Sequence, residues 1–402
     1  MGIPIKNQIR DLAEQYHFSE ELINRYSFYH GIARTAEIVK ALTIHPKNYA
    51  LRVNTLLTTP DELIKTLQEK DIKVHQHPIL KEALLVEVDG PRELKVKDKK
   101  VAIHKSAASR VLIGSNVGAP SIQDPENLNI GDEVSITDKY GTLVGNGILM
   151  MESSEISSQK RGVAIRVTES KYRLPNFQNL KEYLRGQFIE QDLPSMLIGA
   201  QLNIKPKDRV LDLNVGEGKI LTHIWQRNST VTGTRIIAID SSGSKIQKLN
   251  ENVKRLRMNK APFEIMKLTI RQLEKRFNRD ETFDSIVISP PSSETGQRPK
   301  VSDTTNEHHI LKAAKIQKAL IQQAARLIKR NGEIYYNTNS LDPEENELII
   351  RYAVDELKLT IVKQDYFIGD RCTGNFPGAE YLQYFYPDKQ DTPGYFIAKL
   401  VK

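Results

Sequence analysis

The 402-residue sequence contains only one cysteine, Cys372, and no long hydrophobic run. A single cysteine excludes an internal disulfide framework and any zinc site built from several cysteines. No apolar stretch approaches the roughly 18 residues that a membrane-spanning helix needs, and residues 1–10 lack the apolar core of a signal peptide. We therefore expect a cytoplasmic protein without a membrane partner.

The composition indicates a globular protein with a basic surface. Hydrophobic residues make up 39% of the chain and charged residues 27%, which is ordinary for this class. The 58 Lys and Arg residues exceed the 50 Asp and Glu residues and give a formal charge of +8. This excess is compatible with a nucleic-acid partner, but also with an unspecialised basic surface, so motifs have to decide.

The pattern of apolar residues predicts an α/β protein in three parts. Residues 1–92 combine helical periodicity with short strands and predict a small α+β domain. Residues 96–168 carry short strands around one helix at 105–114, which predicts a small β-barrel. In residues 170–402, apolar strands alternate with helices and predict a Rossmann-like parallel sheet with helices on both faces.

A glycine-bearing turn in the third part is a candidate cofactor site. It follows the strand 209–213, and its glycines let the backbone approach a ligand closely. The next strand, 235–240, ends in a carboxylate that can accept hydrogen bonds from ribose hydroxyls. The alternative is a turn that merely connects a strand to a helix. The candidate contacts are Asp212, Asn214, Gly216, Gly218, Lys219 and Asp240.

Several motifs, in the same order along the chain, resemble those of one enzyme family. Residues 289–299 (SPPSSETGQRP) resemble DAPCSGxGQRP, the catalytic turn of RNA cytosine-carbon-5 methyltransferases. Residues 336–347 (YNTNSLDPEENE) resemble that family's YSTCSxxPEENE segment. Further matches are LRVNT at 51–55, QDLPS at 191–195 and DTPGYFIAKL at 391–400. The chain is thus similar to the archaeal and eukaryotic tRNA methyltransferases of the RsmB/NOP2/NSUN family.

Residues 106–120 and 130–134 resemble a PUA domain, a small RNA-binding barrel. The resemblance implies that the whole chain is a class I S-adenosylmethionine methyltransferase domain with a PUA-like barrel and an N-terminal α+β segment. In the family, this layout acts on the acceptor end of tRNA. The alternative for this segment is some other small β module.

The two cysteines that the resemblance implies are absent. In the family, the cysteine of the second segment attacks carbon 6 of the base, and the cysteine of the first turn helps to release the product. Asn339 and Ser292 hold these positions. An amide cannot form the covalent adduct, and the serine hydroxyl is not ionised near neutral pH without a dedicated base. The resemblance therefore implies a protein that binds structured RNA, tRNA or ribosomal RNA, without methylating carbon 5 of cytosine.

Other interpretations stay open. Cys372, beside Arg371, is a candidate replacement thiol, although a bystander thiol is the simpler interpretation. Residues 289–291 (SPP) also resemble the (S/D/N)PP(Y/F/W) turn of enzymes that methylate exocyclic amines. That predicts an active RNA methyltransferase with another target atom, but Ser292 replaces the stacking aromatic residue. An inactive protein would serve as a chaperone, an assembly factor or the RNA-docking partner of an active methyltransferase.

The resemblance implies S-adenosylmethionine as the cofactor, with altered contacts. The family's DMCAAPGGKTTH aligns with residues 212–223 (DLNVGEGKILTH), so Glu217 adds a negative charge that Lys219 is placed to offset. Two aspartates of the family align with Thr269 and Ser289. Each lost charge-assisted hydrogen bond weakens binding by about 1.5–3 kcal/mol, so binding and its loss both remain open.

Basic residues near aromatic ones are candidate RNA contacts. Lys and Arg bind phosphates, and aromatic rings stack on unpaired bases. Tyr172 lies between two basic residues, and Tyr183 lies within a basic segment at 181–185. The predicted RNA-binding residues are Lys105, Arg110, Lys171, Arg173, Arg185, Arg298 and Lys300.

Overall fold

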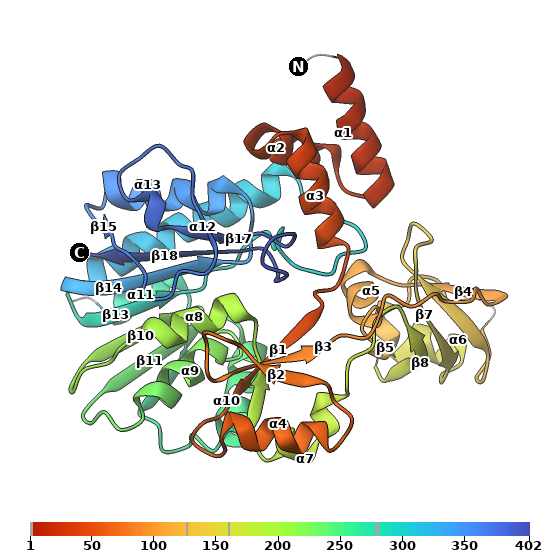
Figure 1. Ribbon diagram of the computed structural model, residues 1–402, viewed down its shortest axis with the longest axis horizontal. Helices are drawn as coiled ribbons and strands as arrows, with labels where there is room; N and C mark the ends of the chain where they lie inside the picture. Colours follow the sequence, from red (N-terminus) through yellow and green to blue (C-terminus); the bar gives the residue numbers. More distant parts are fainter. Residues whose placement is uncertain (1–2, 126–127, 160, 278–280) are drawn as a thin grey trace. The chain divides into compact units, whose positions relative to one another are not determined.

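A computed structural model describes residues 3–125, 128–159, 161–277 and 281–402. Contacts divide the chain into two compact units (Figure 1). The first unit contains Met1–Lys47, Glu87–Asn176 and Arg298–Thr304, and the second contains Asn48–Val86, Phe177–Gln297 and Thr305–Lys402. Within the described ranges, no helix has both the length and the apolar character needed to cross a bilayer.

The first unit combines an N-terminal group of helices with a five-stranded sheet. The helices are α1 (Ile3–Tyr16), α2 (Glu20–His30) and α3 (Ile32–Leu42). The strand order is β4-β6-β7-β8-β5. The strands are β4 (Lys99–Ala102), β5 (Val117–Gly118), β6 (Glu133–Thr137), β7 (Leu143–Leu149) and β8 (Val163–Ser170). The helix predicted at 105–114 is α5 (Lys105–Val111), and α6 (Ser153–Gln159) follows β7. The predicted β module is present in this unit.

A small four-stranded sheet belongs to the second unit and has the order β2-β3-β1-β9. Its elements are β1 (Asn48–Val53), α4 (Pro60–Gln68), β2 (Val74–Gln76), β3 (Ala83–Glu87), α7 (Lys181–Leu184) and β9 (Phe188–Glu190). β1 pairs antiparallel with β9, and Leu51 lies opposite Glu190. Because this pairing joins segments that are distant in sequence, the contacts divide the chain differently from the predicted ranges 1–92, 96–168 and 170–402. Those ranges stay a prediction about sequence modules.

The large sheet of the second unit confirms the predicted parallel arrangement. Its order is β12-β11-β10-β13-β14-β18-β17-β16, and β15 also pairs with β18. β10 pairs in parallel with β11 and β13, and β13 with β14, whereas β18 runs antiparallel to β14. The strands are β10 (Arg209–Leu213), β11 (Arg235–Asp240), β12 (Phe263–Lys267), β13 (Phe283–Ile288), β14 (Ile328–Thr338), β15 (Thr360–Ile361), β16 (Asp370–Arg371), β17 (Gln383–Phe385) and β18 (Tyr395–Val401).

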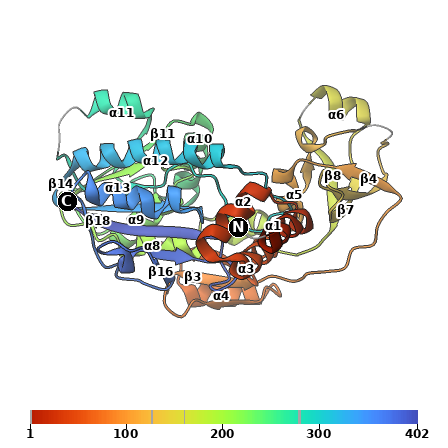
Figure 2. The same cartoon turned by 90° about the horizontal axis from the view of Figure 1, so that it is seen from above.

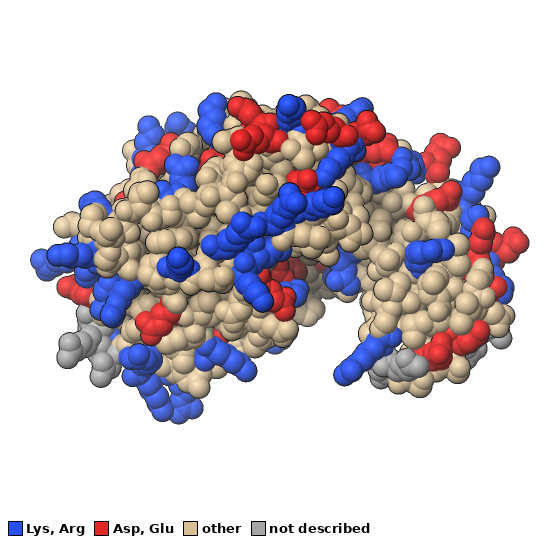
Figure 3. All heavy atoms as spheres, turned by 90° about the horizontal axis from the view of Figure 1, so that it is seen from below, with Lys and Arg blue, Asp and Glu red and all other residues tan. Residues whose placement is uncertain are grey.

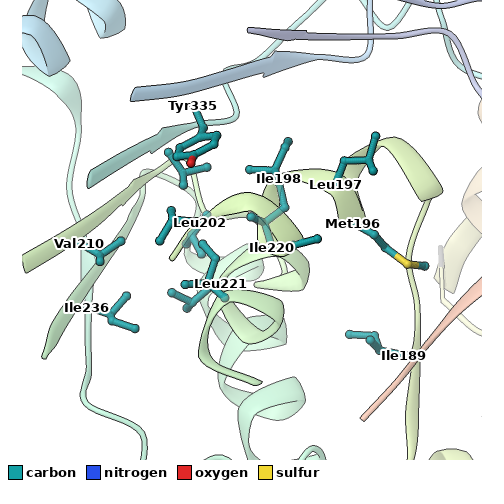
Figure 4. Packing of buried hydrophobic residues seen from close by; sticks show 14 of the residues in the cluster. Ile189, Met196, Leu197, Ile198, Leu202, Val210, Ile220, Leu221, Ile236 and Tyr335 are labelled. Atoms are coloured by element: carbon teal, nitrogen blue, oxygen red, sulfur yellow. The ribbon is translucent and has the colours of Figure 1, made fainter. Parts of the chain in front are cut away.

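Helices cover both faces of this sheet, as Figure 2 shows for α12 and α8. The helices are α8 (Leu193–Gln201), α9 (Lys219–Asn228), α10 (Gly243–Arg255), α11 (Ile270–Arg276), α12 (Glu307–Leu327) and α13 (Glu347–Asp355). In the core, Ile198 and Leu221 of α8 and α9 pack with Val210, Ile236 and Tyr335 of the strands (Figure 4). This packing fixes the carboxyl ends of β10, β13 and β14 at one edge, where doubly wound folds bind ligands.

Candidate functional site

A pocket of about 210 Å³ lies at the carboxyl ends of β10, β13 and β14. Its lining residues are Asn214, Lys245, Ser289, Pro290, Pro291, Ser292, Glu294, Asn337, Thr338, Asn339 and Tyr395. The fold therefore brings Ser292 and Asn339, which are distant in sequence, to one cavity. One lysine and one glutamate contribute charge, and the other lining residues are neutral.

Asn337 of β14 connects the end of β13 with the start of β18. Its amide Nδ2 donates to the carbonyl of Ile288 (3.0 Å) and to Ser289 Oγ (2.9 Å). Tyr395 OH donates to Asn337 Oδ1 (2.7 Å). The sequence motifs did not point to Asn337 as a site residue, although it lies two residues before Asn339 in the 336–347 segment.

Two amide oxygens in the pocket lining are uncommitted. Among the described residues, the buried oxygens Asn214 Oδ1 and Asn339 Oδ1 have no hydrogen-bond partner. By contrast, Ser292 Oγ accepts from the Glu294 amide (3.3 Å). A polar cavity with free acceptors suits hydrogen bonding to a ligand, because an unpaired buried acceptor is otherwise unfavourable.

The carboxylate at the end of β11 is built into the glycine turn. Asp240 Oδ2 accepts from the Gly216 amide (3.1 Å), and Oδ1 accepts from the Ser242 amide (2.8 Å). Asp212 lies beside it in the interior. Burial raises the pKa of the Asp212 carboxyl well above its usual range, and the negative charge of Asp240 adds to this.

The two glycines of the turn have different roles. Gly218 is the N-cap residue of α9 with a φ of +80°, and a Cβ there would lie 2.2 Å from Leu249 Cδ1. Its missing side chain therefore makes room for the core. Gly216, with a φ of +59°, has no atom nearer its Cβ position than 4.0 Å. Only Gly216 leaves open space of the kind that a ligand needs.

The remaining predicted cofactor positions are engaged within the protein. Glu217 forms an ion pair with Lys248 (2.9 Å), and the positive charge of Lys219 also helps to lower the pKa of the Glu217 carboxyl. Thr269 caps α11, with Oγ1 accepting from the Gln272 amide (3.4 Å). Of the eight predicted cofactor residues, Asn214 and Ser289 line the pocket. Thr269 and Ser289 hold the two positions at which the family resemblance implies aspartates.

Buried polar contacts hold the start of α9 against β1. Arg52 is fully buried, and its guanidinium donates to Thr222 Oγ1 (2.8 Å), the Lys219 carbonyl (2.5 Å) and Gln191. Burial lowers the pKa of Arg52 to about 9, so the guanidinium stays protonated at neutral pH. The glycine turn, in which the Gly216 amide donates to Asp240, is therefore followed by a helix, α9, whose start is held in place by buried hydrogen bonds.

His223 of α9 gives the second unit an acid-sensitive contact. Its buried Nε2 lies 2.8 Å from Glu82 Oε1, and Arg227 also pairs with Glu82 (2.9 Å). Burial lowers the pKa of His223 to about 4, although Glu82 opposes the shift. Burial alone would raise the pKa of Glu82, but the hydrogen bond from His223 and the charge of Arg227 bring it to about 2. At neutral pH, neutral His223 donates to ionised Glu82.

We predict that folding stability falls as the pH drops from 6.5 toward 4. The unfolded chain protonates His223 near pH 6.5, whereas the folded chain resists protonation until about pH 4. Between pH 7 and pH 5 the loss is about 2 kcal/mol of unfolding free energy. Urea titrations at the two pH values measure it. His223→Gln keeps a donor toward Glu82 and should remove most of this pH dependence; an equal dependence in both proteins would contradict the assignment.

The structure places Cys372 away from the residues that line the pocket. It is buried, and it is not among the residues that line the pocket. Burial raises the pKa of the Cys372 thiol to about 11, and the negative charge of Glu347 adds to this. The raised pKa does not favour Cys372 as a replacement thiol. A thiol is the inert form at neutral pH.

The predicted RNA contacts differ in accessibility. Arg110, Arg173 and Arg185 are exposed, and Lys171 and Arg298 are half-buried. Lys105 is about half exposed, and its Nζ lies 3.8 Å from Asp303 Oδ1. Arg185 belongs to the second unit and the other predicted contacts to the first. Figure 3 shows a short band of Lys and Arg side chains on part of the face it draws, with several acidic side chains near one edge.

Some of the residues predicted to contact RNA are buried, so the prediction is wrong for them. Lys300 is 8% exposed and pairs with the buried carboxylate of Asp303, so it is not available to a phosphate. Tyr172 is 3% exposed and packs in the core of the β module, so it cannot stack on a base. The ring of Tyr183 is covered on one side by Arg255, whose guanidinium carbon lies 3.8 Å from the ring centroid.

Comparison with known proteins gives the same assignment along the whole chain. The model of "16S rRNA methyltransferase RsmB/F" matches residues 199–401, that of an RsmF/B-like ferredoxin-like domain matches 19–92, and that of the PUA domain matches 99–170. The tRNA (cytosine(72)-C(5))-methyltransferase of Pyrococcus horikoshii is 33% identical over 389 residues, 96% of this chain and 97% of the relative.

Two further relatives agree. Human tRNA (cytosine(72)-C(5))-methyltransferase NSUN6 is 26% identical and covers 88% of this chain, which spans 81% of that protein. The crystal structure of NSun6 from Pyrococcus horikoshii with SFG superposes with a TM-score of 0.85, at 33% identity, over 96% of this chain and 99% of that one. The chain therefore belongs to the RsmB/F family of RNA methyltransferases, with the class I methyltransferase fold and a PUA domain.

Proposed function

We propose that this protein binds tRNA and holds an unpaired base in the pocket without methylating carbon 5 of cytosine. One observation carries the proposal: Ser292 and Asn339 line the same cavity, and the chain's only thiol, Cys372, is outside the residues that line it. Attack on carbon 6 of a pyrimidine needs a thiolate, and an asparagine amide is not a nucleophile of that kind.

The relatives support tRNA as the RNA. Two of them are named as tRNA (cytosine(72)-C(5))-methyltransferases, and the similarity includes the PUA domain. A base taken out of its stack can be held by hydrogen bonds to its edge. Asn214 and Asn339 supply uncommitted amides, and Ser292 supplies a hydroxyl. Binding by hydrogen bonds alone is reversible, which suits an RNA chaperone or a docking protein.

S-adenosylmethionine binding is also proposed, at lower affinity than a complete family site provides. The structure of a relative with SFG, an analogue of the cofactor, supports cofactor binding. Here Asp240 and the space beside Gly216 suit the ribose side of the ligand. The sulfonium side has Ser289 instead of a carboxylate, which weakens attraction to a cation.

Incubation of the purified protein with tRNA and labelled S-adenosylmethionine tests the proposal. We expect saturable tRNA binding and no 5-methylcytidine in the digested RNA by mass spectrometry. Formation of 5-methylcytidine by the unaltered chain would refute it. Label found on an exocyclic amine would instead support the amine-methylating interpretation of the 289–291 turn.

Charge reversal of exposed residues in the first unit tests how the RNA is bound. Arg110→Glu with Arg173→Glu should weaken tRNA binding by about tenfold or more and reduce the salt dependence of log K by about two, because each phosphate contact contributes nearly one unit. Filter binding at several salt concentrations measures both. Lys312→Glu, an exposed residue of α12 in the second unit, serves as the control. An unchanged salt slope in the double variant would place the RNA elsewhere.

A further inference from the structure

Glu345 is a fully buried carboxylate that is held by four hydrogen bonds. It accepts from the Ser293 amide (2.9 Å), Ser340 Oγ (2.7 Å) and Gln317 Nε2 (2.8 Å), and the Ser293 hydroxyl is its fourth donor. The residue ends a short 3₁₀ turn, Pro343–Glu345, and does not itself line the pocket. Neither the covalent methylation mechanism nor the loss of its two cysteines requires a carboxylate at position 345.

Three of the four hydrogen bonds come from the direct neighbours of the two altered positions. Ser293 follows Ser292, and Ser340 follows Asn339. One carboxylate therefore connects the loop after β13 with the loop after β14. Around it, the Gly296 amide donates to the Asn339 carbonyl (3.2 Å), completing a second link between the same loops.

A third link runs through Thr295. Its Oγ1 lies 3.0 Å from Ser340 Oγ and accepts from the Leu341 amide (3.1 Å). Gln317 of α12 also donates to the Pro291 carbonyl (3.0 Å), so the helix beneath the loops takes part. Glu345 is the common acceptor in this network, and both loops lose a partner if it is changed.

The carboxylate is held without a positive partner. All four donors are neutral, and within the described part of the chain no Lys or Arg lies within ion-pair distance of Glu345. Burial raises the pKa of this carboxyl, and the hydrogen bonds oppose the shift. A buried carboxylate without a counter-charge is destabilising. Groups kept against stability are concentrated at functional sites.

We propose that Glu345 is a positioning residue that holds the two pocket loops at one separation and so defines the geometry at positions 292 and 339. A carboxylate suits this role because it accepts several bonds at once, whereas an amide of the same size presents one oxygen and two donors. The role concerns the pocket of the proposed function, but it holds in the free protein and does not depend on RNA being the ligand.

Hydrogen–deuterium exchange of Glu345→Gln and Glu344→Gln tests the role. In Glu345→Gln, the donors compete for one oxygen, so peptides covering 289–297 and 338–342 should both exchange about tenfold faster. Peptides of β10 and α9 should not change, and the urea midpoint should stay the same or rise. Glu344→Gln, one residue away and only half-buried, should match the unaltered protein.

Ser340→Ala serves if Glu345→Gln does not fold, because it removes one donor and leaves the carboxylate in place. It should loosen the same two segments by a smaller factor. Unchanged exchange in either loop, or faster exchange across the whole methyltransferase domain, would overturn the positioning role. tRNA-binding assays on the same proteins test the proposed function separately. If the unaltered protein binds no tRNA, the proposed function is wrong, but the exchange data still decide the role of Glu345.

Discussion

Introducing Asn339→Cys together with Ser292→Cys should turn a protein that makes no 5-methylcytidine into one that makes it. Both positions line one pocket, and the loops that carry them are tied together through Glu345. A thiolate at 339 can attack carbon 6 of the base, and a thiol at 292 restores the group that the family uses for product release. Mass spectrometry of nucleosides from treated tRNA measures the product.

The single variants separate the two roles. Asn339→Cys alone should form a protein–RNA adduct that is stable to denaturation, because the releasing thiol is absent. Ser292→Cys alone should form neither adduct nor product. The conservative pair Asn339→Ser and Ser292→Ala controls for changes in pocket size and should stay inactive. Absence of any adduct in the double variant, under conditions where both cofactor and tRNA bind, would show that the pocket no longer accepts a cytosine.

Ser289→Asp should strengthen S-adenosylmethionine binding by about tenfold or more. The change places a carboxylate at the end of β13, and a charge-assisted interaction with the sulfonium contributes about 1.5–3 kcal/mol, with 1.4 kcal/mol per tenfold. Ser289 Oγ now accepts from Asn337 Nδ2, and a carboxylate oxygen can accept that bond as well. Isothermal titration calorimetry of the two proteins measures the difference.

A neutral replacement of similar size isolates the charge in that experiment. Ser289→Asn has nearly the volume of aspartate but no charge and should leave the affinity within about threefold. S-adenosylhomocysteine lacks the positive sulfonium, so its affinity should rise less in Ser289→Asp than that of S-adenosylmethionine. Equal gains for both ligands would indicate that the new carboxylate contacts another part of the cofactor.

The methyltransferase domain was largely predictable because its signals are local. Parallel strands buried on both faces give continuous apolar runs, and glycines and prolines mark the turns at their ends. The motifs at 289–299 and 336–347 follow β13 and end β14, so placing both at the carboxyl edge of one sheet needed only the order of the elements. The absent thiols were visible as residue identities.

Contacts between distant segments were not predictable in this way. Lys300 and Tyr172 have the residue types of an RNA contact, but burial removes them from the surface. Gly218 has the residue type of a ligand-binding turn, yet its missing side chain makes room for Leu249. The network of Glu345 depends on donors from three separate segments. The pattern of residues within one helix or strand does not indicate which distant residues will pack beside it.

The amino-acid sequence alone therefore determined the family, the fold class and the chemical groups present at positions 292 and 339, because these depend on residue type and local order. Only the tertiary structure decided which basic side chains remain accessible, that Cys372 is buried with a raised pKa, and that one carboxylate joins both pocket loops. The physical reason is that burial and pairing arise between residues far apart in the chain, and their effect on charge and access exists only once the chain is packed.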